Sequence, residues 1–250
     1  MSQYDDFAAL HVPGDPLVIF NVWDAGSARA VAAAGAKAIA SGSYGVAEAN
    51  GYRDGEDFPF ELALENCRRM VSVTDLPVSI DMEAGYGDNA EEVARSAAAV
   101  AAAGAIGVNL EDRAPGASEL LPLGEATARV AAAASAGLWV NARTDVYRGK
   151  QPGELAPALV DETIARAEAF ASAGAGSLFV PFLGDHPTIA AICARSPLPV
   201  NILWAPGRGT HAELAALGVA RISYGHGPWA AAMEWLGERA KLAFAGEVGG

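Results

Sequence analysis

The feature that most constrains the fold is a regular alternation of short apolar runs with alanine-rich amphipathic stretches along the whole chain. Helical patterns are clearest at residues 90–103, 124–136, 161–173, 210–217 and 228–244. The apolar runs have the length and flanking turn residues of strands, and they fall at residues 17–23, 36–41, 77–82, 107–110, 138–142, 177–181, 199–204 and 221–224. Strands that alternate with helices in this way form parallel sheets.

A short glycine motif marks most of the expected helix ends. A small or apolar residue, a glycine and another apolar residue recur around Gly35, Gly104, Gly137, Gly174 and Gly218, each time just before a strand. Glycine commonly ends a helix in this way because it adopts the left-handed conformation without strain. Eight strand-helix units therefore predict a single α/β domain over residues 1–250 with a (β/α)8 TIM-barrel fold. An open, doubly wound sheet is the alternative.

Charge and cysteine content limit the class of partner. The chain has 30 acidic and 17 basic residues and a formal net charge of -13, which argues against binding nucleic acid. A small anionic substrate must then be held by a few placed groups. Cys67 and Cys193 show no metal-binding or disulfide spacing, and no leader or membrane-spanning segment is evident. We expect a cytoplasmic protein with reduced thiols and no membrane partner.

Acidic residues gather where two consecutive strands end, and a TIM barrel places its active site at that end of the strands. Asp81 and Glu83 follow the third strand, and Glu111 and Asp112 follow the fourth. Neighbouring carboxylates repel one another unless a cation or proton lies between them. Adjacent residues of a strand face opposite ways, so we expect Glu111 rather than Asp112 to face the site. The sequence predicts a divalent metal at Asp81, Glu83 and Glu111, with Arg143 opposite.

The longest irregular connection follows the second strand, from residue 43 to about 58. It is rich in glycine and acidic residues. Loops of this length in compact domains are often lids over a site. We expect a gating loop at about 43–58, with an ordinary solvated loop as the alternative.

The motifs taken together resemble the isocitrate lyase/phosphoenolpyruvate mutase superfamily. The resemblance is strongest to the small bacterial branch described as phosphonomutase-like or carboxyvinyl-carboxyphosphonate phosphorylmutase-like. It spans most of the chain in matching order. The motifs that carry it are Asn21-Val-Trp-Asp24-Ala-Gly-Ser-Ala28, Ser41-Gly-Ser43, Gly51-Tyr-Arg-Asp54, Asp81-Met-Glu83-Ala-Gly-Tyr-Gly87, Asn109-Leu-Glu111-Asp112 and Asn141-Ala-Arg143-Thr-Asp145.

The resemblance implies a role for each matching residue. Asp81 corresponds to a direct Mg²⁺ ligand, and Glu83 and Glu111 to ligands that act through water; the sequence does not distinguish Mg²⁺ from Mn²⁺. Asp54 corresponds to the acid of the gating loop. The expected catalytic residues are Asp54, Glu111 and Arg143. The expected substrate-binding residues are Ser41, Gly42, Ser43, Arg143, Asn201 and His226; an unengaged turn histidine is the alternative for His226, and barrel packing for Asn201.

The implied reaction is cleavage of a bond beside a metal-stabilised enolate in a 2-oxo or 2-hydroxy di- or tricarboxylic acid. The loop at 113–121 lacks the Cys, His and Lys that the full lyases and mutases of the superfamily carry there. Strand six ends in Phe179-Val-Pro-Phe182, where relatives that cleave tricarboxylates have a glutamate. We therefore expect a Mg²⁺-dependent carbon-carbon lyase or decarboxylase acting on oxaloacetate or a methylisocitrate-like acid.

Two other functions stay open at this stage. The first is cleavage of a phosphorus-carbon bond by a phosphonopyruvate hydrolase or phosphonomutase, with Ser118 or a water molecule as acceptor. The second is a catalytically reduced barrel that binds a 2-oxo acid without turning it over. The resemblance also implies a homo-oligomer, a tetramer whose subunits exchange the eighth helix at 228–244.

Overall fold

The computed structural model describes residues 2–151 and 156–247, and its centre is a ring of eight parallel strands. The pairing order is β1-β8-β7-β6-β5-β4-β3-β2. A bridge between Val22 and Ser41 brings the two ends of this order together, so the barrel is nearly closed. The strands are β1 (Leu17–Ile19), β2 (Ile39–Ala40), β3 (Val78–Asp81), β4 (Gly107–Glu111), β5 (Trp139–Arg143), β6 (Ser177–Val180), β7 (Val200–Leu203) and β8 (Arg221–Ser223). The (β/α)8 prediction is confirmed.

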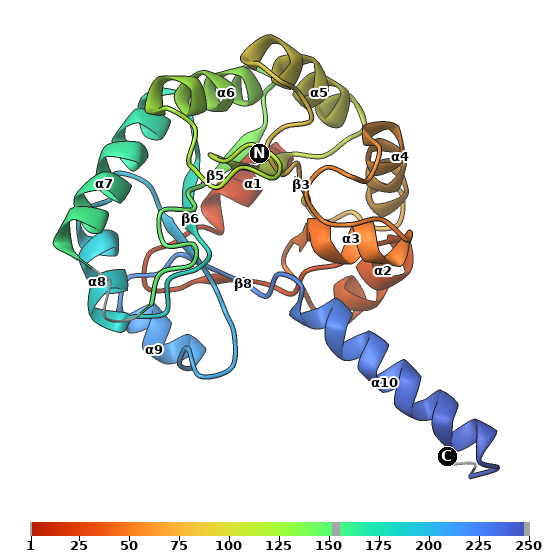
Figure 1. The fold of residues 1–250 in the computed structure, drawn as a ribbon. Helices are drawn as coiled ribbons and strands as arrows, with labels where there is room; N and C mark the ends of the chain where they lie inside the picture. Colours follow the sequence, from red (N-terminus) through yellow and green to blue (C-terminus); the bar gives the residue numbers. More distant parts are fainter. Residues whose placement is uncertain (1, 152–155, 248–250) are drawn as a thin grey trace.

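Helices surround this ring, and most of their ends lie close to the predicted positions (Figure 1). The five glycines of the helix-end motif have φ angles between 80° and 96°, as expected for left-handed helix caps. The helices are α1 (Gln3–Ala9), α2 (Ala25–Ala33), α3 (Ser43–Ala49), α4 (Phe60–Val71), α5 (Ala90–Ala102), α6 (Leu123–Ser135), α7 (Pro157–Ser172), α8 (His186–Arg195), α9 (His211–Ala216) and α10 (Gly227–Phe244).

The prediction of an irregular connection from residue 43 was wrong for its first half. Residues 43–49 form the helix α3, with Gly42 and Asn50 as its N-terminal and C-terminal caps. The remaining residues, 50–58, form the non-helical part of the connection.

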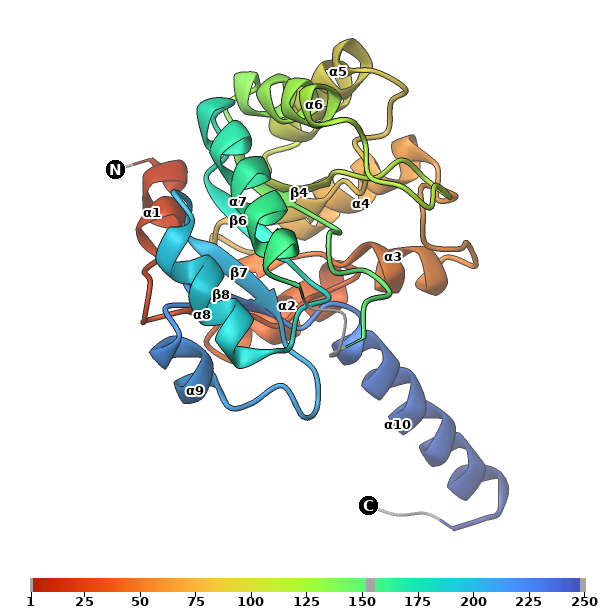
Figure 2. The same ribbon diagram turned by 60° about the vertical axis from the view of Figure 1, so that its left-hand side comes forward.

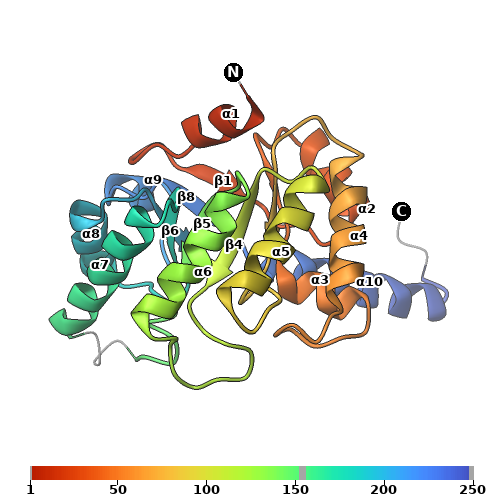
Figure 3. The same ribbon diagram turned by 90° about the horizontal axis from the view of Figure 1, so that it is seen from above.

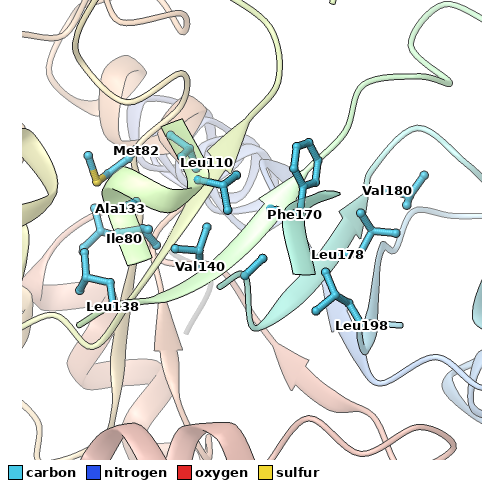
Figure 4. Packing of buried hydrophobic residues seen from close by; sticks show 14 of the residues in the cluster. Ile80, Met82, Leu110, Ala133, Leu138, Val140, Phe170, Leu178, Val180 and Leu198 are labelled. Atoms are coloured by element: carbon cyan, nitrogen blue, oxygen red, sulfur yellow. The ribbon is translucent and has the colours of Figure 1, made fainter. Parts of the chain in front are cut away.

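The main hydrophobic core fills the space between the outer face of the sheet and the helices (Figure 4). Val140 and Leu178 of neighbouring strands are fully buried, as are Ala133 of α6 and Phe170 of α7. Small alanine side chains let the helices approach the sheet closely, so packing is dense without large side chains. This rigid shell fixes the positions of the strand ends.

The inside of the barrel is polar and hydrogen-bonded across neighbouring strands. Asn141 Nδ2 donates to Asn109 Oδ1 over 2.8 Å, and Ser177 Oγ donates to Asn141 Oδ1 over 2.7 Å. At the N-terminal end, α1 lies across the barrel (Figure 3) and His11 stacks on Trp139 with ring centroids 4.8 Å apart. This end is closed, which leaves the C-terminal ends of the strands as the open face.

Helix α10 departs from the rest of the barrel. It projects away from the ring of helices instead of covering it (Figures 1 and 2). Pro228 is its only buried residue among those described, whereas Trp235 is 60% exposed and Phe244 is 90% exposed. On the flank of the barrel, residues of β1 and α2 line a cavity of about 580 Å³ that is mostly apolar. Within the described ranges, no helix has both the length and the apolarity needed to cross a bilayer.

Candidate active site

Two adjoining cavities open where the strands end, and they bring most of the predicted site residues together. The first has a volume of about 260 Å³ and is lined in part by Gly42, Asp81 and His226. The second, of about 270 Å³, is lined in part by Glu83 and Glu111. The two share the side chains of Ser43, Asp54, Arg143 and Arg148. The larger apolar cavity beside β1 and α2 lies elsewhere and contains none of these groups.

Asp81 stands at the end of β3 and faces the first cavity. Its Oδ2 accepts a hydrogen bond from the Ser43 backbone N–H over 3.2 Å, and its Oδ1 accepts one from the Glu83 N–H over 3.3 Å. Ser41 lies beneath it, only 2% exposed, and its hydroxyl oxygen accepts from the Asp81 N–H. Ser41 therefore positions Asp81 and lines neither of the two cavities.

Glu83 is buried and forms hydrogen bonds to the backbone of the connection at 50–58, which hold that connection over the site. Its Oε2 accepts from the backbone N–H groups of Gly55 and Glu56 over 2.7 and 2.8 Å, and Tyr86 donates its hydroxyl to Oε1 over 3.3 Å. Burial, reinforced by the charges of Asp81 and Asp54, raises the pKa of Glu83 to about 8. The loop that sequence analysis identified as a lid is thus held down by a residue from the acidic motif.

The turn after β3 is strained and is braced from outside. Gly85 has a φ of 112°, and a Cβ there would lie 2.7 Å from Val93, so only glycine fits. Arg129 of α6 donates to the carbonyl oxygens of Ala84 and Gly87 over 3.2 and 2.8 Å. The role of Arg129 could not be predicted from the sequence, because the carbonyl groups that it binds lie more than 40 positions away along the chain.

The opposite side of the site, called the arginine wall below, is formed by Arg113, Arg143 and Arg148 together with Asp145 and Glu111. Asp145 accepts from Arg143 Nε over 2.8 Å and from Arg148 Nη1 over 3.1 Å, and Arg113 Nε lies 3.4 Å from its Oδ2. Burial opposes ionisation of Asp145, but Arg143 and Arg148 outweigh it and lower its pKa. Arg143 also pairs with Glu111 over 2.8 Å. Burial nevertheless raises the pKa of Glu111 to about 8, against the opposing effect of Arg143.

Asp112 faces away from Glu111, as the alternation of the strand predicts. Its Oδ1 accepts from the Asp145 N–H over 3.0 Å, and its Oδ2 pairs with Arg166 of α7 over 3.2 Å. Asp112 therefore supports the arginine wall from behind. Its partner, Arg166, comes from a helix 54 positions further along the chain.

Of three further residues predicted to act in the site, one lines a site cavity and two do not. His226 lines the first cavity, where its ring lies 5.5 Å from that of Tyr44. Asn201 is fully buried inside the barrel and exchanges hydrogen bonds with Ser223, so the structure does not bring it to the cavity. Ser118 lies in a separate cavity of about 380 Å³ and offers its backbone carbonyl to Arg113. Its position does not support a role as phosphoryl acceptor.

The acidic residues fit a metal held mainly by water and substrate. In the described part of the chain, no three acidic, His or Cys side chains converge as ready ligands. The Glu83 carboxylate is turned toward backbone N–H groups and that of Glu111 toward Arg143. Asp81 faces the cavity, and Mg²⁺ commonly binds through one or two carboxylates while keeping several waters. The hard oxygen donors and the mutual repulsion of Asp81, Glu83 and Asp54 fit such an ion.

Comparison with known proteins identifies the class to which this fold and site belong. The family model described as phosphoenolpyruvate phosphomutase matches residues 7–244, and the chain belongs to that family. An uncharacterised protein of Mycobacterium tuberculosis (strain ATCC 25618 / H37Rv) is 34% identical over 96% of this chain and 90% of its own length. An oxaloacetate decarboxylase of Rhodopseudomonas palustris (strain BisA53) is 36% identical over 69% of this chain, but the match covers only 60% of that enzyme.

Solved structures agree with this assignment. A Burkholderia cenocepacia J2315 protein, provisionally described as a phosphonomutase, is 48% identical over 96% of this chain and 98% of its own, with a TM-score of 0.93. A phosphonopyruvate hydrolase solved with oxalate and Mg²⁺ shares the fold at a TM-score of 0.85 and 23% identity, over 98% of this chain and 88% of its own. The predicted resemblance to the isocitrate lyase/phosphoenolpyruvate mutase superfamily is confirmed.

Proposed function

We propose that this protein is a Mg²⁺-dependent carbon-carbon lyase that acts on a small 2-oxo or 2-hydroxy acid, with decarboxylation of oxaloacetate as the leading reaction. The observation that carries the proposal is the opposed pair of walls in one cavity, with Asp81 on one side and Arg143 on the other. The similarity of the chain to oxaloacetate decarboxylases supports the choice of reaction.

In the proposed reaction, Arg143 and the Ser43 hydroxyl hold the C1 carboxylate of the substrate. A Mg²⁺ ion held by Asp81 and water would supply Lewis-acid stabilisation of the charge that develops on the substrate. When the C3–C4 bond breaks, carbon dioxide leaves and its bonding electrons remain on the substrate as an enolate, whose charge Arg143 stabilises. A proton from water, or from His226 at the cavity wall, then adds to C3 and gives pyruvate.

The role of the lid follows from its contact with Glu83. Gly55 and Glu56 donate to that carboxylate, so the loop at 50–58 closes over the cavities and places Asp54 at their shared rim. A closed loop excludes bulk water while the bond breaks. Its opening then releases the product.

A coupled assay for pyruvate and phosphate tests the proposal directly. The panel is oxaloacetate, methylisocitrate, dimethylmalate and phosphonopyruvate, each with Mg²⁺ and with EDTA. Pyruvate without phosphate, lost in EDTA and reduced at least about 10³-fold by Asp81→Asn, supports the lyase. Asp161→Asn is the matched control, because Asp161 pairs with Arg195 on the protein surface, where both are about half or more exposed. A panel without any turnover contradicts the proposal and favours a binding barrel.

Cleavage of a phosphorus-carbon bond is the second candidate function. The 48% identity to the Burkholderia protein described provisionally as a phosphonomutase favours it. If the protein releases phosphate from phosphonopyruvate and Asp81→Asn abolishes that release, the function is phosphorus-carbon cleavage and the proposed carbon-carbon lyase is wrong. Because Ser118 lies outside the two site cavities, water is the acceptor that this alternative requires.

We also propose that the protein works as a homo-oligomer through α10. The helix leaves its own barrel with Trp235 and Leu236 more than half exposed, and the flank beside β1 and α2 holds an apolar cavity. The proposed partner is a second copy of the chain, with α10 seated on the neighbouring barrel. Light scattering should show an oligomer for the full chain and a smaller species after truncation at residue 226; an unchanged mass would refute it.

A further inference from the structure

Arg148 faces the cavity from the arginine wall, and no role in the reaction described above involves it. It follows β5 and Thr144 in a turn, and its side chain is 50% exposed, compared with 16% for Arg143. It lines both site cavities. Its guanidinium carbon lies 5.4 Å from the centre of the Phe182 ring, and that of Arg143 lies 5.5 Å from the same ring. Both guanidinium groups thus lie against the same aromatic side chain.

The charges on this wall do not cancel. Arg113, Arg143 and Arg148 contribute three positive charges, whereas Asp145 and Glu111 contribute at most two negative charges. Arg166 and Asp112 pair with each other behind the wall. The side chain of Asp145 is fully buried, so it can accept no contact from the cavity. At least one positive charge is left over, and Arg148 is the most exposed of the three arginines.

The contact that Arg148 makes leaves most of its donors directed elsewhere. Among the described residues, its hydrogen bond to a carboxylate uses Nη1 alone, over 3.1 Å to Asp145 Oδ2. Arg143 uses Nε and Nη2 toward the same carboxylate. A guanidinium group has five N–H donors in a fork that matches a carboxylate. Anchored at one nitrogen and stacked on Phe182, Arg148 is preorganised to bind a second anion.

We propose that Arg148 is a specificity-determining residue that binds a second carboxylate of the substrate, at the end of the molecule away from the 2-oxo or 2-hydroxy group. The proposal rests on the proposed function, because it assigns Arg143 to the first carboxylate. It limits the substrate class to dianionic acids and explains why the cavity combines a positive wall with the apolar surface of Phe179 and Phe182. A monocarboxylic 2-oxo acid would leave the charge of Arg148 uncompensated.

Binding of malate and lactate tests this role without any turnover. The two ligands share a 2-hydroxy acid group and differ by one carboxylate. With Mg²⁺ present, wild type should bind malate about 10- to 100-fold more tightly than lactate, as expected for one charge-assisted hydrogen-bonded pair. In Arg148→Gln this preference should fall to within about threefold, with lactate affinity unchanged. Arg148→Lys should retain part of the preference because it retains the charge.

The control is Arg195→Gln, which removes an arginine whose ion pair lies on the surface. It should leave both affinities unchanged. Three results would overturn the proposal: equal binding of malate and lactate by wild type, an unchanged preference in Arg148→Gln, or a parallel loss of both ligands. The last would mean that Arg148 only maintains the structure of the wall. Because the readout is binding, a protein that decarboxylates nothing can still show the Arg148 effect, so the two proposals fail separately.

Discussion

The two walls of the site satisfy their carboxylates in different ways. On the acidic wall, formed by Asp54, Asp81 and Glu83, the hydrogen bonds to Asp81 and Glu83 come mainly from backbone N–H groups. On the arginine wall, Glu111 and Asp145 are held by guanidinium groups. In the ranges that the structure describes, no arginine or lysine forms an ion pair with the three acids of the acidic wall.

Backbone strain follows the same division. The described residues other than glycine that have a positive φ are Glu56, Glu83 and Tyr86, with angles of 62°, 51° and 51°. They lie in the acidic wall, in the loop bound to it, or in the turn that follows β3. Such conformations cost about 1 kcal/mol or more each and persist where surrounding contacts impose them. The acidic wall therefore combines strained backbone with carboxylates that have no arginine or lysine partner among the described residues, whereas the carboxylates of the arginine wall are paired.

This comparison predicts its largest effect on stability at Asp145. Asp145→Asn would leave Arg113, Arg143 and Arg148 without their shared carboxylate, and removing one partner from a buried ion pair costs about 3–5 kcal/mol. Asp81→Asn should cost less than about 1 kcal/mol or stabilise the protein, because it removes repulsion between acids. Urea unfolding of both variants measures the contrast. Equal losses would show that the two walls do not differ in this way.

The stability difference between wild type and Asp145→Asn should also depend on pH. The pKa of Asp145 is lowered in the folded protein, so the unfolded chain binds the proton first as the pH falls. The stability that Asp145 contributes is complete above its unfolded pKa of about 3.9 and is lost as the pH falls through the lower, folded value. The stability gap between wild type and Asp145→Asn should therefore be constant from pH 5 to 7 and narrow below about pH 4. A gap that widens in acid would contradict the assignment.

The sequence predicts the site wherever position on a strand decides it. Asp81, Glu111 and Arg143 end consecutive strands, and parallel strands end at one face of a barrel. Asn201 also lies on a strand, but its side chain is fully buried against Ser223, and depth inside a barrel depends on strand tilt, which the pattern does not contain.

The two helix arginines that support the site could not be predicted, because their contacts join distant parts of the chain. Arg129 and Arg166 lie on helices, where an arginine normally marks a solvated face, yet both are less than a tenth exposed and bind strand-end loops more than 40 positions away. Helix α3 was missed for a different reason. It has only seven residues, one of them glycine, and no side chain caps its start, so neither length nor capping indicated it.

The smallest predicted effect concerns Tyr86 and tests whether backbone donors alone hold the acidic wall. Among the described residues, Tyr86 supplies the one side-chain hydroxyl that donates to Glu83, over a long 3.3 Å; Tyr86→Phe removes it and leaves the Gly55 and Glu56 donors in place. The loss should be about 0.5–1.5 kcal/mol in stability, with less than a tenfold change in kcat of the proposed reaction. Glu83→Gln is the comparison variant, since an amide side chain replaces the charge to which the lid is fastened. If Tyr86→Phe lowers kcat as far as Glu83→Gln, the hydroxyl acts on the substrate, and the acidic wall depends on side chains as the arginine wall does.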